Sequence, residues 1–149
     1  MKGLTLIELM VVIAIIVILA SFSFVGYSSW VETQRAQDSV ERLYKLLMHA
    51  RSKSFFEKKM CGVCWNDTYG EVKKFFLKCD ENGNGNLNDD VAISVEELKY
   101  GFKVPNVNEG CVRFYTEGYT NNIGTFVLKG DVDVPYKKVV ISWNKIEKR

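Results

Sequence analysis

The feature that most constrains this chain is an uncharged run of 23 residues, Leu9 to Val31, close to its amino terminus. A helix rises about 1.5 Å per residue, so a helix of this length covers about 35 Å, enough to cross the hydrocarbon core of a bilayer. One carboxylate, that of Glu8, stands at the start of the run. An unpaired carboxylate costs at least ~2.5 kcal/mol near a bilayer centre. Glu8 is therefore expected either near the membrane surface or paired with a cation.

The residues before the run, Lys2-Gly3-Leu4, together with Glu8 and the run itself, resemble the class III signal of type IV prepilins and type II secretion pseudopilins. In that family a prepilin peptidase cuts after the glycine and the new terminus is N-methylated. The resemblance implies cleavage after Gly3 and methylation of Leu4, although the family usually has Phe at that position. Cleavage creates a cationic amine, and in a filament Glu8 is expected to pair with the amine of a neighbouring subunit.

Two other interpretations of the amino terminus are weaker. A secretory signal peptide needs a basic region before its apolar core; here only Lys2 is basic, and Glu8 interrupts the start of the core. A plain single-pass anchor has no use for Glu8 or for the preceding Gly3. Lys2 on the short leading side favours a cytoplasmic terminus and an exported body.

Apolar residues recur at helical spacing beyond the uncharged run. They are Ala36, Val40, Leu43, Leu47 and Ala50, flanked by Tyr44 and Leu46. This pattern predicts one long helix over about residues 4–56, apolar all round in its first half and amphipathic in its second.

Short strands separated by turns are predicted after the helix, over 60–65, 72–79, 91–95, 100–104, 111–115, 125–129 and 136–143. Within 72–79, alternation places Val72, Lys74, Phe76 and Lys78 on one face and Lys73, Phe75, Leu77 and Cys79 on the other. The expected fold is α+β, with the long N-terminal helix packed on an antiparallel sheet. The expected divisions are a leader (1–3), a membrane and filament-core helix (4–27), an amphipathic helix (28–56) and an exported β-rich head (57–149).

The chain has four cysteines, all in the predicted head: Cys61, Cys64, Cys79 and Cys111. In an oxidising compartment an even number indicates disulfides, and four cysteines allow three full pairings among which the sequence does not choose. A c-type haem site needs His where the chain has Trp65, a four-cysteine zinc site needs two close pairs, and a thioredoxin-like pair needs a βαβ setting. Disulfides, or buried thiols in a reducing compartment, are therefore expected.

The loop from Asp80 to Asp90 places oxygen-bearing side chains at alternate positions, with Gly85 at the sixth. This matches the start of an EF-hand-like calcium loop, but the twelfth position is Val91 instead of Glu, and no helix precedes the loop. The candidate calcium ligands are Asp80, Asn82, Asn84, Asn86, Asp89 and Asp90. The alternative is a surface turn without metal, in which Asn and Gly accept a left-handed backbone.

The head also resembles the minor pseudopilins of the GspH/FimT group. The resemblance rests on the segments 112–114, 124–128 and 138–142, on Gly118 and on the Asn/Gly-rich loop. Some minor pilins of this group bind DNA through a Gly-Arg-x-Arg motif after the last strand. The matching stretch here, 144–147, has one basic residue, Lys145, and the acidic Glu147. Two interpretations of Lys145, Lys148 and Arg149 therefore stand, contact with DNA phosphates or a solvated basic tail.

No pattern of catalytic residues is found, and no enzyme activity is expected. The single histidine, His49, falls on the polar face of the predicted helix, and Glu96 and Glu97 are adjacent and so point to opposite faces of a strand. The formal net charge of +2 neither favours nor excludes nucleic acid.

The sequence thus predicts a minor pseudopilin or minor type IV pilin, without a cofactor unless the loop binds calcium. Its expected location is the inner membrane, in a single pass, with the head in the periplasm. Its expected partners are other pilins or pseudopilins, the prepilin peptidase, the inner-membrane assembly platform and membrane lipid. Two alternatives stay open: a minor pilin that binds DNA during competence, and a membrane-anchored exported binding or enzyme domain without a filament role.

Overall fold

The computed structural model describes residues 5–66, 71–105, 110–120, 122–130 and 132–149, and leaves the side chains of residues 22–26 undescribed. Within these residues it has one helix and seven strands: α1 (Leu6–Glu57), β1 (Cys61–Cys64), β2 (Val72–Cys79), β3 (Ser94–Lys103), β4 (Cys111–Phe114), β5 (Gly124–Leu128), β6 (Lys138–Ser142) and β7 (Lys145–Lys148). By its contacts the chain divides into an N-terminal unit, Met1–Gln34, and a C-terminal unit, Arg35–Arg149. Helix α1 contributes to both.

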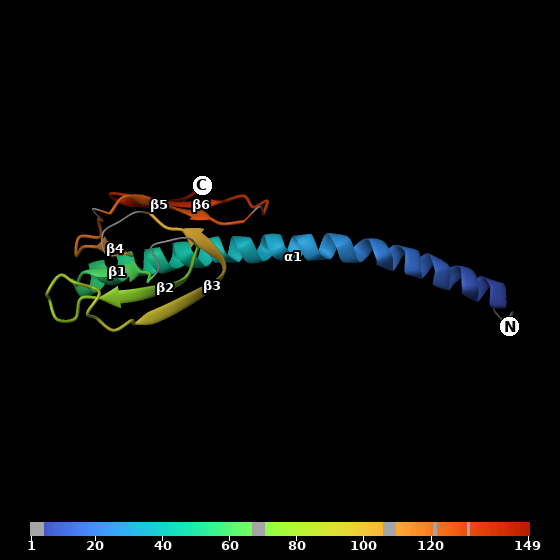
Figure 1. Ribbon diagram of the computed structural model, residues 1–149, viewed down its shortest axis with the longest axis horizontal. Coiled ribbons are helices and arrows are strands. Elements are labelled where there is room, and N and C mark those ends of the chain that lie inside the picture. The colour runs from blue at the N-terminus through green and yellow to red at the C-terminus, as the bar shows by residue number, and fades with distance from the viewer. Residues whose placement is uncertain (1–4, 67–70, 106–109, 121, 131) are drawn as a thin grey trace. The chain divides into compact units, whose positions relative to one another are not determined.

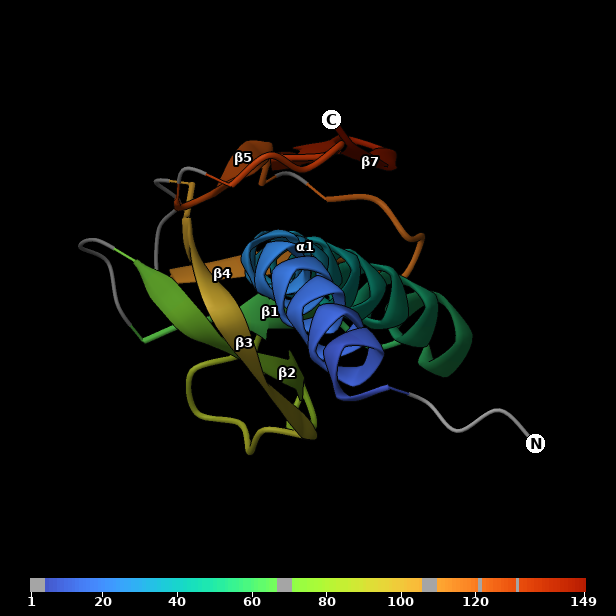
Figure 2. The same cartoon turned by 90° about the vertical axis from the view of Figure 1, so that its right-hand side faces the viewer.

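The strands of the C-terminal unit form one antiparallel sheet in the order β4-β1-β2-β3-β5-β6-β7. Figure 1 shows β1, β2 and β3 beside the C-terminal part of α1. Figure 2 shows the strands curving around the part of α1 that belongs to the C-terminal unit. The predicted α+β fold, with the helix against an antiparallel sheet, is therefore confirmed.

Two strand predictions were wrong. The segments 91–95 and 100–104 do not form separate strands, because Ser94–Lys103 is the single strand β3, in which buried Leu98 alternates with exposed Glu97 and Lys99. Glu97 and Lys99, which interrupt the apolar pattern, lie on the exposed side of the sheet. The segment 145–148 forms β7, whose Ile146 lies opposite Ile141 of β6. It escaped prediction because Ile146 is the only residue of β7 that is fully buried.

The simple alternation predicted for β2 was also wrong at its start. Val72 and Phe75 are both buried, while Lys73 and Lys74 between them are both exposed. The register with β3 shifts between Val72 and Lys74. A β-bulge adds one residue to a strand, so the alternation of faces changes phase at that point.

The C-terminal part of α1 supplies one side of the hydrophobic core. Every residue of the predicted apolar stripe is buried, with Val40 at 1% exposure and the other four at 0%. Of the two flanking residues, Leu46 is buried at 6% exposure and Tyr44 is partly buried. Against it pack aromatic side chains of the sheet, with Phe75 at the centre of ring contacts to Trp65, Phe102 and Phe126 at 6.0–6.3 Å between centroids. The amphipathic pattern predicted the buried face of the helix correctly.

Two buried serines on α1 fix the helix to the sheet by hydrogen bonds that the sequence did not predict. Ser39 Oγ donates to Arg35 O and accepts from the backbone N–H of Tyr100 in β3. Ser54 Oγ lies 3.1 Å from the carbonyl oxygen of Tyr115. Buried hydroxyl groups need such partners because an unpaired one costs free energy.

Candidate functional site

The first described residues form a capping box at the start of α1. Glu8 Oε2 accepts hydrogen bonds of 2.8 Å from both the backbone N–H and the Oγ1 of Thr5, and the Glu8 N–H points back to Thr5 Oγ1 at 3.4 Å. This reciprocal pair satisfies amide groups that have no partner inside the helix. The carboxylate also stands at the positive end of the helix dipole. Glu8 therefore has a role within its own chain before any neighbour is present.

The capping box was visible in the sequence as Thr5-Leu6-Ile7-Glu8, a Thr-x-x-Glu pattern in front of an apolar run. The predicted cleavage and methylation positions, Gly3 and Leu4, lie outside the described residues. The structure consequently leaves the pairing of Glu8 with a neighbour's amine as a prediction.

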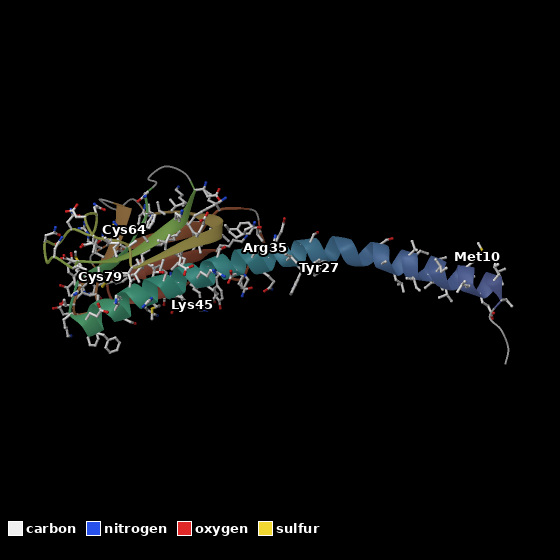
Figure 3. All side chains as sticks on the ribbon, turned by 90° about the horizontal axis from the view of Figure 1, so that it is seen from below. Met10, Tyr27, Arg35, Lys45, Cys64 and Cys79 are labelled. Carbon is white, nitrogen blue, oxygen red and sulfur yellow. A yellow bond between two sulfur atoms is a disulfide. The ribbon has the colours of Figure 1, made fainter. Side chains whose placement is uncertain are left out.

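The helix surface that follows Glu8 is apolar on all sides and uncovered. The large apolar side chains from Leu6 to Leu19 are between 48% and 77% exposed. Figure 3 shows Met10 projecting outward from α1. A contiguous apolar surface of this kind marks a site that binds protein or membrane.

No helical stretch within the described residues meets the combination of length and apolarity that a bilayer crossing requires. The segment predicted to span the membrane, 4–27, includes residue 4 and the side chains of residues 22–26, which lie outside the described part.

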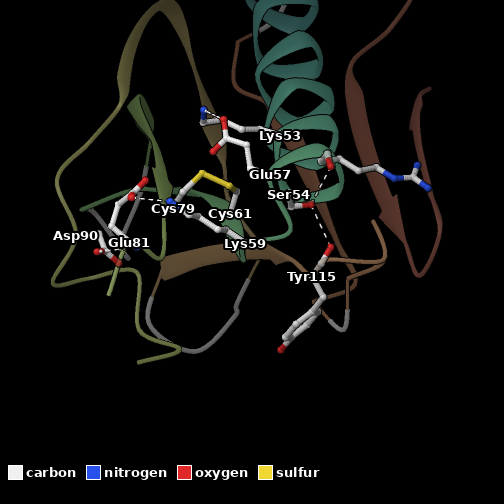
Figure 4. Close-up of a disulfide and its surroundings, with 10 residues drawn as sticks. Lys53, Ser54, Glu57, Lys59, Cys61, Cys79, Glu81, Asp90 and Tyr115 are labelled. Atoms are coloured by element: carbon white, nitrogen blue, oxygen red, sulfur yellow. Dashed lines mark hydrogen bonds and ion pairs between the residues drawn. A yellow bond between two sulfur atoms is a disulfide. The ribbon is translucent and has the colours of Figure 1, made fainter. Parts of the chain in front are cut away.

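Two disulfides hold β1 to both of its neighbours. Cys61 is bonded to Cys79, its direct partner across the β1–β2 pair, and Cys64 is bonded to Cys111, its direct partner across the β1–β4 pair. Figure 4 shows the first of these with the ion pair between Lys59 and Glu81 (2.7 Å) beside it. Strand β1 has only four residues, so covalent links at both ends fix the register of a strand that backbone pairing alone would hold weakly.

The Asn/Gly-rich loop lies over the outer side of β1. Its Leu87 is fully buried in a small cluster with the Cys64–Cys111 disulfide. Gly62 permits this approach, because a Cβ at that position would lie 2.6 Å from Leu87 Cδ1 and 2.4 Å from the carbonyl oxygen of Val112. The loop is thus part of the folded C-terminal unit.

All six candidate calcium ligands form hydrogen bonds within the loop. Asp80 accepts from the backbone N–H groups of three later loop residues, and the Nδ2 of Asn86 donates to Asp89 Oδ2 at 3.0 Å. Among the described residues, no group of three or more His, Cys, Asp or Glu side chains is placed to hold a metal ion. Any cation here would therefore depend on amide and backbone oxygens as well as carboxylates.

The three candidate DNA contacts each have a carboxylate partner. Lys145 and Arg149 both form ion pairs with Glu147. The hydrogen bond from Lys145 has the larger effect and that from Arg149 the next, and both lower the pKa of Glu147. Lys148 forms an ion pair with Glu41 of α1 and lies 5.2 Å from the ring centroids of Tyr44 and Tyr136. Of these three basic residues only Lys148 connects separate parts of the C-terminal unit, because the partner of Lys145 and Arg149 is two residues away in the sequence.

Two further features bear on the other candidate functions. His49 is exposed on α1, as the sequence predicted.

A stack of three aromatic rings was not predicted: Tyr119 lies between Tyr115 (5.3 Å) and Trp143 (5.0 Å), and Trp143 is 56% exposed. Trp143 is distant from the two tyrosines in the chain, so no local pattern could have indicated the complete stack.

Comparisons with known families agree with this geometry. Residues 1–24 match the prokaryotic N-terminal methylation motif, and residues 39–145 match the type II transport protein GspH. The first match covers the Glu8 capping box, and the second covers the C-terminal part of α1 and the sheet as far as the start of β7. No curated protein and no solved structure matches the chain at a significant level.

Proposed function

The chain belongs to the family of the type II transport protein GspH, and we propose that it serves as a minor subunit of a type II secretion pseudopilus or a type IV pilus. The family is structural and its members are pilin-like filament subunits, so this chain assembles with other pilins. The observation that carries the proposed role is the uncovered apolar surface of α1 directly after an N-terminal carboxylate.

In this proposal the precursor enters the inner membrane with Lys2 on the cytoplasmic side and its C-terminal unit in the periplasm. A prepilin peptidase cuts after Gly3, the Leu4 amine is methylated, and the assembly platform moves the subunit from lipid into the filament. The 23-residue uncharged run supports the membrane step. The two disulfides support an oxidising compartment for the C-terminal unit.

Glu8 has the chemistry for the pairing step. An ionised carboxylate offers about four acceptor positions, so Glu8 can keep its hydrogen bonds to Thr5 and still accept a neighbour's ammonium group. The pairing would remove two isolated charges from an apolar filament core, where each is costly. The preformed capping box holds the carboxylate in place for this contact.

The maturation step is tested by co-expressing the precursor with a prepilin peptidase and determining the amino terminus of the product. A terminus at Leu4, lost in a Gly3→Val variant, is the expected result. A mature protein that still begins at Met1 would overturn the proposal.

The pairing step is tested by Glu8→Gln, because glutamine also fits a capping box but carries no charge. Membrane insertion should be preserved while incorporation into filaments is lost. Glu32→Gln is the matched control, since Glu32 is an exposed carboxylate on the same helix, and it should assemble normally. Normal assembly of Glu8→Gln would show that the charge pair is not needed.

A further inference from the structure

We propose that the loop Asp80–Asp90 binds one calcium ion, independently of any role in a filament. The sequence alone left the loop open between a calcium site and a metal-free turn. The structure adds an observation that the metal-free turn does not explain, namely a buried carboxylate oxygen without a partner.

Asp90 carries this observation. The residue is 9% exposed, and its Oδ2 is fully buried without a hydrogen-bond partner in the structure. Its other oxygen, Oδ1, accepts from the backbone N–H of Glu81 at 3.3 Å, so the carboxylate reaches back across the loop to its first residues. A buried unpaired carboxylate oxygen is costly, so this group requires a bound cation or an ordered water.

The loop backbone is arranged as a cation-binding loop requires. Asp80 Oδ1 accepts from the N–H groups of Gly83 and Asn84, and Oδ2 accepts from that of Gly85, all within 2.7–3.2 Å. Gly85 has a φ of 77°, the left-handed conformation that the sixth position of such loops uses for its sharp turn. These contacts place the Asp80 carboxylate inside the loop.

Neutral amide oxygens complete the set of donors. The Oδ1 atoms of Asn82, Asn84 and Asn86 each accept the N–H two residues further on, at 2.7–3.0 Å. A carbonyl oxygen has two lone pairs, so each can bind a cation while keeping its hydrogen bond. Asp89 Oδ2 faces the same side chains, at 3.0 Å from Asn86 Nδ2.

An all-oxygen set on a loop favours calcium over other common ions. Calcium takes 6–8 oxygen ligands in adaptable geometry, whereas magnesium demands a small octahedron and zinc prefers nitrogen and sulfur. The many neutral ligands predict weak binding, with a Kd on the order of 10⁻⁴ to 10⁻³ M, typical of extracellular modules. Bound calcium would also hold Leu87 over the Cys64–Cys111 disulfide.

The experiment is calorimetric titration of the full-length protein in detergent with calcium chloride, and separately with magnesium chloride. The wild type should bind one calcium ion, and magnesium should bind at least about tenfold more weakly. Asp90→Asn keeps an oxygen for the Glu81 N–H but loses the charge, and it should raise the calcium Kd at least about tenfold. Asp133→Asn removes the same charge from an exposed position outside the loop, and it should leave the Kd unchanged.

A second variant keeps the test valid if Asp90→Asn fails to fold. Asn82 is exposed, and Asn82→Ala removes one proposed ligand; it should weaken calcium binding while the melting temperature in EDTA stays near that of the wild type. No heat up to about 10 mM calcium, well above the expected range, would overturn the proposal. So would equal affinity for magnesium, or undiminished calcium binding in both loop variants.

Discussion

Two stretches of the same helix meet opposite surroundings. Between Leu6 and Leu19 the large apolar side chains of α1 are at least 48% exposed, whereas the apolar stripe from Ala36 to Ala50 is at most 6% exposed. The second stretch has a sheet of its own chain to cover it. The first has no cover among the described residues, and its apolar residues surround the helix on every side.

This contrast shows which part of the fold is complete in a single chain. The C-terminal unit contains its own core, two disulfides and the hydrogen bonds that fix the helix to the sheet. The N-terminal unit carries a capped helix whose apolar surface requires lipid or other subunits. Variants that act on one stretch should leave the other unchanged, and the following predictions test that separation.

The largest effect is expected from removing the Cys64–Cys111 disulfide by Cys64→Ser with Cys111→Ser. This bond closes a sequence separation of 47 residues, against 18 for Cys61–Cys79. The chain-entropy relation gives a loss of about 4 kcal/mol for the first bond and about 3 kcal/mol for the second. Denaturant unfolding of this variant and of Cys61→Ser with Cys79→Ser measures the two losses in the free energy of unfolding. A larger loss for the Cys61–Cys79 variant would contradict the prediction.

A smaller but sharper test compares two leucines on α1. Leu47→Ala should destabilise the C-terminal unit by about 3 kcal/mol, because Leu47 is fully buried and its removal leaves a cavity. Leu9→Ala makes the same chemical change at a residue that is 53% exposed and should change unfolding by less than about 0.5 kcal/mol. Equal losses in the two variants would show that the two stretches are not independent.

At the other end of the helix, Thr5→Ala should cost about 1 kcal/mol of local helix stability, because it removes the capping hydroxyl. Hydrogen exchange should increase in the first turn of α1 only. The melting temperature of the C-terminal unit should stay that of the wild type; a shift there would mean that the cap supports more than its own turn.

The smallest effect concerns pH and the C-terminal unit alone. The hydrogen bond to Glu41 raises the pKa of Lys148 above its ordinary value of 10.5. The contact between Lys148 and Glu41 therefore stabilises the folded state fully below the pKa that Lys148 has in the unfolded chain. This stabilisation is lost as the pH rises through the higher pKa of Lys148 in the folded state. Melting temperatures from about pH 9 to about pH 12 should fall less steeply for Lys148→Met than for the wild type. Lys45→Met, at an exposed position of α1, is the control and should retain the wild-type slope.

Structural features that depend on the spacing of neighbouring residues were mostly predicted from the sequence. The extent of α1 and its buried stripe followed from residues close together in the chain. The membership of the GspH family followed from several short segments of the head, each read by its own local pattern. The Thr5–Glu8 capping box was equally local and was overlooked. Strand β7 and the bulge in β2 were missed because burial of a single residue, Ile146 or Val72, gives too little signal.

Features set by strand pairing could not be predicted. The disulfide connectivity follows from the register of β1 against β2 and β4, which places each cysteine directly opposite its partner. The partner of Lys148 is 107 positions away in the sequence. The orphaned oxygen of Asp90 depends on how the loop folds over β1, which composition does not reveal.

The short strand β1 has a mechanical consequence. The chain leaves α1 at Glu57 and enters β1 at Cys61, so tension drawn along the helix reaches a covalent crosslink almost at once. The Cys64–Cys111 bond links two residues that are 47 positions apart in the sequence. While it is intact, the chain between them cannot be pulled out, which removes about 160 Å of extensible length at ~3.5 Å per residue. Under load the segment from Cys64 to Cys111 therefore cannot extend unless this disulfide is first reduced.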